Sequence, residues 1–475
     1  MTVSHWIFAH ILEIIGYLLA ILLIPRILLE RHHPGATIAW LLAIGLIPFI
    51  GVPLYFLIGG KRIKRIKREK DWGMLNMGNS AHDPDAGNLL AGGQKVARLL
   101  TRTGAFPPAP NNRMVIIDDG IVAYTTLVNL LENAGESIEI ATFILGRDDV
   151  GRAIIELLAR KARQGVEVRL LLDAYGCLFS RGRFVRPLKD AGGQVGVFMP
   201  MLPLRRRWSA NLRNHRKMVI VDGCHSMVGG MNLTREYMGP TLYKKRWKDA
   251  CMAVTGNCVD HLRTVFIQDW IYCTGEELDR GLFSPVASPD GDNGSIVQVV
   301  GDGPDIPERP LYSGVLAALS QARERIWVVT PYFVPDEPLS AALELAARMG
   351  CDVRLIIPER SNHPLVDLAG RSFLPDLLAA GVQFYFYQPG MLHAKLIAID
   401  NQLAVVGSAN MDIRSFQLNF EIASFLYTPN DVEQVIRVIE DVIRQSRQIS
   451  TEELGKKGKI REFSEDICRV FSPLL

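Results

Sequence analysis

Two long runs of hydrophobic positions open the chain, at residues 6–25 and 37–59. As α-helices these runs would be about 30 Å and about 34 Å long, which is enough to cross the hydrocarbon core of a bilayer. Neither run carries polar residues at the period that marks a water-facing side, and two runs in tandem are not typical of a cleaved signal peptide. Residues 1–60 are therefore predicted to form a two-helix transmembrane hairpin.

A cluster of positive charge follows the hairpin, in the sequence KRIKRIKREK at residues 61–70. Basic residues beside a membrane span stay on the cytoplasmic side, which predicts that both termini and the soluble body face the cytoplasm. The same cluster could also bind anionic headgroups. The residues that follow, up to position 112, are rich in Gly, Asn, Asp and Pro and show no sustained period. Residues 61–112 are therefore predicted to be a basic segment and linker.

Strand and helix patterns alternate in the rest of the chain, and the same order occurs twice. Each pass has a short apolar strand, an amphipathic helix and a second strand that is apolar almost throughout. Such alternation predicts an α/β fold with right-handed crossovers, and its repetition predicts two halves with pseudo-twofold symmetry, 113–290 and 291–475. The predicted elements lie at 137–143, 150–164 and 166–173 in the first pass, and at 325–332, 339–349 and 351–358 in the second.

Composition narrows the class of protein but not its substrate. Of the 475 residues, 48% are apolar and 22% are charged, which supports large hydrophobic cores and argues against wholesale disorder. The net charge of +3 is too small to indicate a nucleic-acid-binding protein. The seven cysteines show no CxxC pairs and no dense spacing. They are predicted to be scattered thiols rather than a metal or disulfide framework.

One polar motif occurs late in each half. It reads HRKMVIVD in the first half and HAKLIAID in the second, and Gly, then Gly or Ser, and then Asn follow each copy. All corresponding positions are separated by 178 residues. A single HxKxxxxD pattern can arise by chance, but two copies in register with matching residues downstream are not a coincidence. The candidate residues are His215, Lys217, Asp222, Gly230 and Asn232 in the first copy, and His393, Lys395, Asp400, Ser408 and Asn410 in the second.

The residue types in this motif suit phosphoryl transfer. The apolar residues after each lysine predict a strand, and on a strand the histidine and lysine, two positions apart, point to the same side. A histidine serves as nucleophile or general acid near neutral pH, and a lysine binds phosphate oxygens. The small residues and the amide downstream add further groups for the same phosphate. Because the lysines supply the positive charge, and because no His, Cys and carboxylate cluster has ligand spacing, no metal and no cofactor is predicted.

These motifs resemble those of the HKD phospholipase D superfamily, over residues 113 to 428. The resemblance implies two α/β halves packed face to face, with both His–Lys pairs at one shared active site. It also implies that one histidine attacks phosphorus and forms a phosphohistidine, while the other protonates the departing alcohol and later activates the incoming one. We assign His215 as the nucleophile and His393 as the acid and base, an assignment that rests on the family and could be reversed.

The same resemblance implies supporting roles. The lysines and asparagines of the two motifs hold the phosphate and its transition-state charge, while the motif aspartates tie neighbouring backbone instead of reacting. A further carboxylate orients the histidine, and Glu421 in NFEIASFLY fits this position, with Asp249 in RWKDACMAV as its counterpart. An ordinary surface role is the alternative for either acid.

Within the superfamily, the motifs define the chemistry and not the substrate. Three features favour lipid: the hairpin, a basic loop with an aromatic residue at 203–208, and a layout that resembles the bacterial cardiolipin synthases along nearly the whole chain. The loop could equally be a solvated turn. That resemblance implies that two phosphatidylglycerol molecules give cardiolipin and glycerol, at the cytoplasmic side of the bacterial inner membrane.

Two other classes of function stay open at this point. One is a membrane phospholipase D or a nuclease that hydrolyses a phosphodiester, since water and a lipid hydroxyl use the same residues. A nuclease would be expected to show a strongly basic groove, which the charge balance outside residues 61–70 does not indicate. The other is a non-catalytic membrane scaffold, which should have lost a motif His or Lys, and this chain retains all four.

Overall fold

The computed structural model describes residues 3–29, 34–55, 89, 91–200, 209, 211–276, 278, 294–450, 452–453 and 459–470. In this part of the chain, the N-terminal helices form one compact unit and the two α/β halves form another. The basic cluster at 61–70, the basic loop at 203–208 and the predicted boundary between the halves at 290–291 lie outside the described residues.

The N-terminal unit contains α1 (Val3–Leu29), α2 (Pro34–Leu46) and α3 (Pro48–Leu54). The sequence predicts one helix over residues 37–59, but this run is broken at Ile47, whose φ of −136° and ψ of 68° are not helical. Pro48 then begins α3. Proline is favourable here because the N–H groups of the first helical turn have no partner within the helix, so the N–H that proline lacks is not missed. Residues 56–59 lie outside the described part. Among the helices that the structure describes, none is both long enough and apolar enough to cross a membrane.

Side chains in this unit divide between a small core and a broad apolar surface. Leucine and isoleucine side chains on the outer faces of α1 and α2 are exposed, and Leu22 and Leu46 are each 73% exposed. Apolar surface of this extent is unusual where a protein faces water, and it indicates contact with an apolar partner. The core of the unit consists of Ala20, Leu23, Ile27, Ile44, Val52 and Tyr55.

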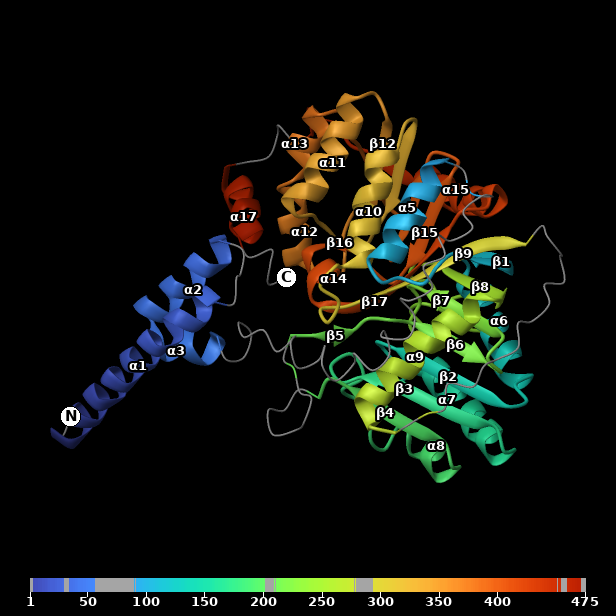
Figure 1. Ribbon diagram of the computed structural model, residues 1–475, viewed down its shortest axis with the longest axis horizontal. Coiled ribbons are helices and arrows are strands. Elements are labelled where there is room, and N and C mark those ends of the chain that lie inside the picture. Colours follow the sequence, from blue (N-terminus) through green and yellow to red (C-terminus); the bar gives the residue numbers. More distant parts are fainter. Residues whose placement is uncertain are drawn as a thin grey trace. The chain divides into compact units, whose positions relative to one another are not determined.

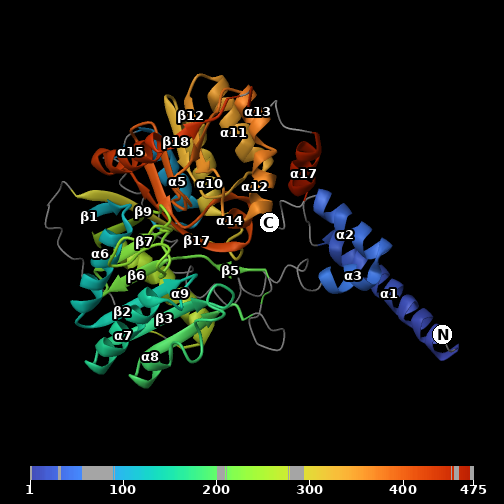
Figure 2. The same cartoon turned by 180° about the vertical axis from the view of Figure 1, so that it is seen from behind.

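The second unit is built on one long sheet (Figures 1 and 2). Its strands run in the order β18-β13-β12-β10-β14-β15-β17-β9-β1-β8-β7-β6-β2-β3-β4, and β5 (Arg213–Asn214) adds to β17. The first half supplies β1 (Ala109–Ile117), β2 (Ser137–Thr142), β3 (Glu167–Asp173), β4 (Gln194–Phe198), β6 (Met218–Val221), β7 (His225–Gly229) and β8 (Cys251–Gly256).

The second half supplies the remaining strands of this sheet. They are β9 (Ser295–Asp302), β10 (Arg325–Val329), β12 (Asp352–Pro358), β13 (Gln383–Tyr387), β14 (Leu396–Ile399), β15 (Leu403–Gly407), β17 (Asn419–Leu426) and β18 (Ser446–Gln448). A separate two-stranded sheet pairs β11 (Phe333–Val334) with β16 (Met411–Asp412).

The two halves repeat one topology. In the first half β2, β3 and β4 are parallel, and β6, β7, β8 and β1 continue the sheet in antiparallel pairs. In the second half β10, β12 and β13 are parallel, and β14, β15, β17 and β9 continue it in the same way. β1 and β9 pair with each other and join the halves into one sheet. The predicted duplication of an α/β unit is confirmed.

Helices pack on the sheet and bury one hydrophobic core in each half. Three of them begin at Asp119, Asp148 and Asp336, whose side chains accept N–H bonds from the first helical turn. The helices are α6 (Gly120–Glu132), α7 (Asp149–Arg163), α8 (Arg186–Asp190) and α9 (Cys258–Thr274) in the first half. Those of the second half are α10 (Pro310–Gln321), α11 (Glu337–Arg348), α12 (Pro364–Arg371), α13 (Leu374–Ala379), α14 (Ile413–Gln417), α15 (Pro429–Arg444) and α17 (Lys459–Val470).

One prediction about the linker is wrong. Residues 91–102, which the sequence assigns to the linker at 61–112, form helix α5 (Ala91–Arg102). This helix packs on α10 and contributes Val96, Ala97 and Leu100 to the core of the second half. The segment is amphipathic, but the two glycines near its start lower its helix propensity. The helix is stabilised by the tertiary contact of its narrow apolar face, which single-sequence propensity does not reveal.

Candidate active site

Each His–Lys pair lies just before a strand instead of on it. β6 and β14 begin only after the lysines, so the prediction that the pairs belong to these strands is wrong. The backbone here bonds to the opposite half. The His215 N–H donates to the Phe420 carbonyl at 2.8 Å, and the His393 N–H donates to the Lys248 carbonyl at 2.7 Å. Each motif is therefore held by a segment of the other half.

The carboxylates that face the histidines are exchanged between the halves. Glu421, on β17 of the second half, has its two oxygens 3.0 and 3.1 Å from Nδ1 of His215 in the first half. Asp249, just before β8 of the first half, lies 2.7 Å from Nδ1 of His393 in the second half. A carboxylate at Nδ1 fixes the ring orientation and directs Nε2 toward a substrate. Neither half contains a complete site of its own.

The two lysines are buried beside the histidines. Lys217 Nζ donates to the His215 carbonyl at 2.6 Å, and Lys395 Nζ donates to the His393 carbonyl while lying 2.7 Å from Nδ1 and 3.2 Å from Nε2 of that ring. Burial lowers the pKa of both lysines, that of Lys395 to about 8, and the charge of Lys395 lowers the pKa of Lys217 further. Two buried ammonium groups that repel each other are complementary to an anion such as a phosphodiester.

Glu421 has the larger number of donors of the two orienting carboxylates. In addition to His215, it accepts hydrogen bonds from the hydroxyl of Ser408 and from Nδ2 of Asn419 at 3.1 Å. Burial raises its pKa, but the charges of His215 and Lys217 and the hydrogen bonds from His215 and Ser408 outweigh burial and hold the pKa at about 2. Glu421 is therefore ionised at neutral pH.

Asp249 has fewer donors. The N–H of Ala250 donates to one of its oxygens at 2.7 Å, and His393 faces the other. Burial raises the pKa of Asp249 to about 7, against the charges of the two lysines and this backbone bond. At neutral pH the Asp249–His393 pair is therefore partly protonated, whereas the Glu421–His215 pair has lost its proton.

Gly230 and Ser408 stand at equivalent positions and account for part of this difference. The Ser408 hydroxyl donates to Glu421 and also contacts the Ile422 carbonyl at 3.3 Å. A Cβ atom on Gly230 would lie 2.2 Å from Oδ1 of Asp249. The Asp249 carboxylate therefore approaches the backbone where a serine side chain would stand, and it loses the donor that Glu421 has.

Aromatic side chains that the sequence reasoning did not single out surround the histidines. Tyr237, Trp247 and Tyr332 have ring centroids 5.0, 5.4 and 6.5 Å from that of His393, and the Tyr237 hydroxyl lies 3.4 Å from Nε2. The Phe143 ring lies 5.0 Å from that of His215. Phe143 and Tyr332 follow closely the parallel strands β2 and β10, so their place at the carboxyl edge of the sheet could have identified them.

Comparisons with known proteins agree with this arrangement. Residues 127–270 and 315–443 match the family described as "Cardiolipin synthase, PLD-like domain", and residues 17–60 match "Phospholipase D-nuclease N-terminal". The chain is 34% identical over 457 residues to cardiolipin synthase 2 of Bacillus cereus, an alignment that covers 94% of this chain and 88% of that one. It is 35% identical over 456 residues to a cardiolipin synthase of Geobacillus kaustophilus, with 94% and 90% covered.

The chain belongs to the cardiolipin synthase family of phospholipase D-like enzymes. The predicted resemblance to this family is confirmed. Among solved structures, a phosphatidylserine synthase of Haemophilus influenzae has a similar fold, with a TM-score of 0.61 and 14% identity over 80% of this chain and 100% of that one. At that identity the likeness concerns the fold alone.

The motif aspartates of this cardiolipin synthase family member bind backbone. Asp222 accepts N–H bonds at 2.8 Å from Gly135, Glu136 and Ser137 at the start of β2. Asp400 accepts N–H bonds from residues 323–325 at the start of β10. Both aspartates have a φ of 51°, a left-handed conformation that Asp adopts more readily than most residues. Neither carboxylate lies against a histidine of the two motifs.

The motif asparagines occupy different surroundings. Oδ1 of Asn232 accepts the Ile144 N–H at 3.0 Å, which ties it to the segment after β2. Nδ2 of Asn410 donates to Asp412 at 3.1 Å, and its backbone N–H donates to the Ser415 hydroxyl. Both side chains are buried. The two motif asparagines are thus held in place by different hydrogen bonds.

Arg216, between the motif histidine and lysine, was missed because the motif leaves this position variable. Its buried guanidinium lies 2.6 Å from Oδ2 of Asp269 on α9, and it donates to the carbonyls of Glu421 at 3.0 Å and Asp302 at 2.9 Å. It therefore fixes the backbone of the residue that orients His215. The second motif has Ala394 at this position, so this brace exists in one half only.

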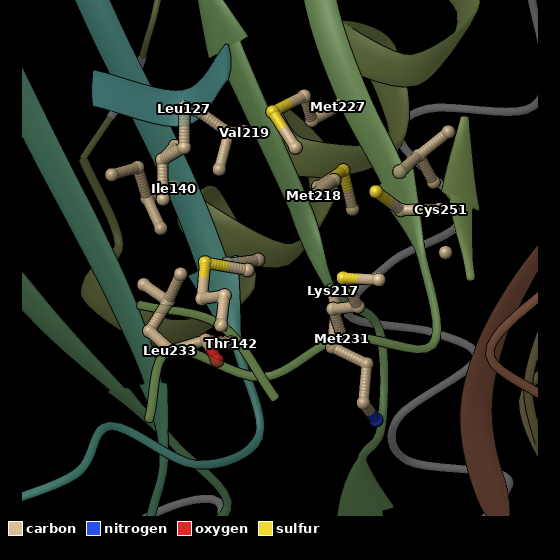
Figure 3. A pocket seen from close by; sticks show the side chains of 14 residues that line it. Leu127, Ile140, Thr142, Lys217, Met218, Val219, Met227, Met231, Leu233 and Cys251 are labelled. Atoms are coloured by element: carbon tan, nitrogen blue, oxygen red, sulfur yellow. The ribbon is translucent and has the colours of Figure 1, made fainter. Parts of the chain in front are cut away.

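A small apolar pocket lies beside each lysine. In the first half methionine, leucine and valine side chains and Cys251 line it together with Lys217. Figure 3 shows the lysine nitrogen pointing away from these side chains. In the second half Leu311, Val315 and Phe416 line the corresponding pocket with Lys395. Apolar contact with the lysine stems orients the ammonium groups toward the histidines.

Among the described residues, no group of three His, Cys, Asp or Glu side chains could hold a metal ion.

Proposed function

We propose that the protein transfers a phosphatidyl group from one phosphatidylglycerol molecule to another and forms cardiolipin and glycerol. The observation that carries this proposal is the exchange of carboxylates, which gives two oriented imidazoles, one from each half, at a single buried and positively charged site. The names of the relatives, cardiolipin synthases from Bacillus and Geobacillus, support the choice of substrate.

In the first step of this proposal, Nε2 of His215 attacks phosphorus, and the bond between phosphorus and the oxygen of the headgroup glycerol breaks. His393 transfers a proton from Nε2 to that oxygen, so glycerol leaves as a neutral alcohol. Lys217 and Lys395 bind the non-bridging oxygens and stabilise their developing charge. The ionised Glu421 stabilises the positive charge on the phosphohistidine ring.

In the second step, the terminal hydroxyl of another phosphatidylglycerol attacks the phosphohistidine. His393 accepts its proton, the bond between phosphorus and His215 breaks, and cardiolipin is released. The asymmetry of the carboxylates supports these roles. Burial lowers the pKa of His215 to about 4, so its ring is neutral and nucleophilic at pH 7. Burial and the charges of Lys395 and Lys217 also lower the pKa of His393, so the proton that an acid requires is held in this pair by the partly protonated Asp249.

The product assay that tests this function uses purified full-length protein in phosphatidylglycerol vesicles. Cardiolipin and glycerol should form in equal amounts, without added divalent metal and in the presence of a chelator. Phosphatidic acid without cardiolipin would identify a hydrolase instead. Loss of activity on chelation that added metal restores would contradict the metal-free mechanism.

The pH dependence of the transfer follows from Asp249. Its pKa of about 7 predicts that kcat/KM falls as pH rises above about 7, because the Asp249–His393 pair then loses the proton that glycerol must receive. A further fall is expected near pH 8, where Lys395 loses its charge. Initial rates measured from pH 5.5 to 9, about the range in which these groups titrate, give both limbs of the pH profile, the fall above pH 7 and the fall near pH 8.

Asp249→Asn separates these two limbs. The asparagine amide can hold the ring of His393 but has no proton that titrates, so the lower residual rate of this variant should lack the fall near pH 7. The fall that Lys395 causes should move to a pH below 8, because the charge of Asp249 no longer raises the pKa of this lysine. An unchanged profile in this variant would show that another group supplies the proton.

Exchange of the small residue beside each carboxylate gives a second prediction. Gly230→Ser should lower the rate of cardiolipin formation by about 10²-fold, since its side chain displaces Asp249 from His393. Ser408→Gly should have the smaller effect, about tenfold or less, because Glu421 keeps its bonds to His215 and Asn419. Equal activity of Gly230→Ser and the unchanged protein would contradict the role given to Asp249.

The protein's location is part of the same proposal. Exposed leucines and isoleucines on α1 and α2 fit burial in a bilayer, and the basic cluster at 61–70 favours the cytoplasmic side of the bacterial inner membrane. Fractionation of cells followed by protease digestion of inverted and right-side-out vesicles tests it. The α/β halves should be digested only in inverted vesicles.

A further inference from the structure

An exposed apolar loop follows β3 at the carboxyl edge of the sheet. Residues 174–185 form a series of turns, and three of their apolar side chains face outward. Tyr175 is 60% exposed, Leu178 36% and Phe179 75%. Single exposed apolar side chains are ordinary, but three within five residues at a loop tip form a patch that favours an apolar partner.

The charge along this segment is one-sided, and within the described part of the chain only Arg186, at its end, forms an ion pair, with Asp190 at 3.4 Å. No acidic residue occurs between Asp173 and Asp190, and this interval carries Arg181, Arg183, Arg186 and Lys189. The corresponding segment after β12 in the second half reads ERSNH at residues 359–363, with an acid and no Phe, Tyr or Trp. The duplicated fold therefore does not require an aromatic and basic loop here. Aromatic tips flanked by arginine are typical of segments that enter the interface of an anionic bilayer.

The loop is bonded to the first catalytic motif through Asp173. One oxygen of this buried carboxylate accepts the N–H groups of Tyr175 and Gly176 at 2.8 and 3.0 Å. The other oxygen accepts the Asn214 N–H at 3.0 Å, directly before His215. The guanidinium of Arg213 lies 5.4 Å from the centre of the Tyr175 ring. The start of the loop and the start of the motif thus share one anchor.

A second connection runs through the segment after β2. The thiol of Cys177 donates to the Phe143 carbonyl at 3.2 Å and accepts the Leu145 N–H at 3.3 Å, and the Ser180 hydroxyl donates to the Leu145 carbonyl. The ring of Phe143 lies against His215 and 5.3 Å from Nζ of Lys217. The exposed tip is therefore carried on a turn that is fixed at its base.

We propose that the tip formed by Leu178 and Phe179 inserts into the interface of an anionic bilayer while the flanking arginines bind lipid headgroups. Because the loop and the first motif share the anchor Asp173, insertion at this place holds His215 close to the depth of the lipid phosphodiester that it attacks. The proposal deepens the proposed function, on which it rests for the identity of the lipid surface. The sequence pointed instead to the basic loop at 203–208, which lies outside the described residues.

The test is fluorescence of full-length protein with Phe179→Trp, in vesicles of phosphatidylglycerol with brominated acyl chains. Leu345→Trp is the matched control, because Leu345 is 59% exposed on α11 and follows an acidic residue. The emission that each variant adds to that of the unchanged protein is compared. Quenching of the emission added by Phe179→Trp, weaker in brominated phosphatidylcholine, is the expected result. Equal quenching at both positions, or no preference for the anionic lipid, would overturn the proposal.

A kinetic measurement accompanies the spectroscopy. The double change Leu178→Ser and Phe179→Ser should lower the ratio of the rate on long-chain vesicles to the rate on monomeric short-chain phosphatidylglycerol by about tenfold, since apolar contact with the bilayer is lost. Leu345→Ser should leave that ratio unchanged. An unchanged ratio in the double variant would contradict insertion. The quenching result does not depend on turnover, so failure of the proposed function and failure of this inference are distinguishable.

Discussion

Replacing His215 with alanine is expected to lower the rate of cardiolipin formation by at least about 10⁴-fold, because a nucleophile is lost that no neighbouring group replaces. His215 is the imidazole whose Nδ1 faces an ionised carboxylate, since the pKa of Glu421 is held at about 2. The other imidazole, His393, faces a carboxylate that is partly protonated. The rate of cardiolipin formation in phosphatidylglycerol vesicles measures this effect.

The matched control for this change is His225→Ala. His225 lies on β7 of the same half, and its Nδ1 contacts the Thr255 hydroxyl at 2.8 Å instead of a carboxylate. Its loss should leave the rate within about twofold, as expected for a partly exposed residue outside the site. Substantial cardiolipin formation by His215→Ala, with the fold preserved, would show that the nucleophile has been misassigned.

Replacing His393 with alanine should lower the rate on phosphatidylglycerol by about 10³-fold, the contribution typical of a general acid and base. Part of this loss should be reversible by the choice of leaving group. In a phosphatidyl ester of p-nitrophenol, the leaving group is p-nitrophenolate, a stable anion that needs no proton. His393→Ala should therefore still release one equivalent of p-nitrophenol in a burst. Stopped-flow absorbance measures this burst.

The same substrate separates the two histidines. His215→Ala should release no burst, because it lacks the group that attacks phosphorus, whereas His393→Ala should release one and then stall, since no base activates the incoming alcohol. The reverse pattern would exchange the two roles. Absence of a burst in both variants, with a burst in the unchanged protein, would show that both histidines are needed for the attack itself.

The repeated motif allowed much of this site to be predicted from the sequence. A constant separation of 178 residues predicted a duplicated fold, and it identified His215, Lys217, His393 and Lys395 without any structure. This worked because the chemistry fixes residue types and short spacings, which a sequence displays directly. Strand and helix positions followed from periodicity in the same way, as for β3, which the structure gives as Glu167–Asp173.

What the sequence could not supply is the partner of each histidine. Glu421 and Asp249 were candidates by position, but nothing in their sequence context states that each faces the histidine of the opposite half. That exchange depends on how the halves pack, and so does the backbone bond from His215 to Phe420. Long-range packing overrides local pattern at such places.

Two further differences have local causes. The apolar run at 37–59 contains Pro48, and the chain breaks there into α2 and α3, a break that hydrophobicity alone does not reveal. The loop at 174–185 could not be identified from the sequence, because its exposed residues, such as Phe179, and its buried residues, such as Cys177, follow no regular period. The fold, and not the sequence pattern, determines which of these side chains faces outward.

The most direct test of the central claim is the site of covalent attachment. His393→Ala is incubated with the p-nitrophenyl phosphatidyl ester and quenched in base, where phosphohistidine is stable, and the peptides are mapped by mass spectrometry. We expect one phosphatidyl adduct per chain, on His215, because this variant can form the intermediate but cannot resolve it. An adduct on any other residue, or a burst of p-nitrophenol with no adduct, would contradict the mechanism.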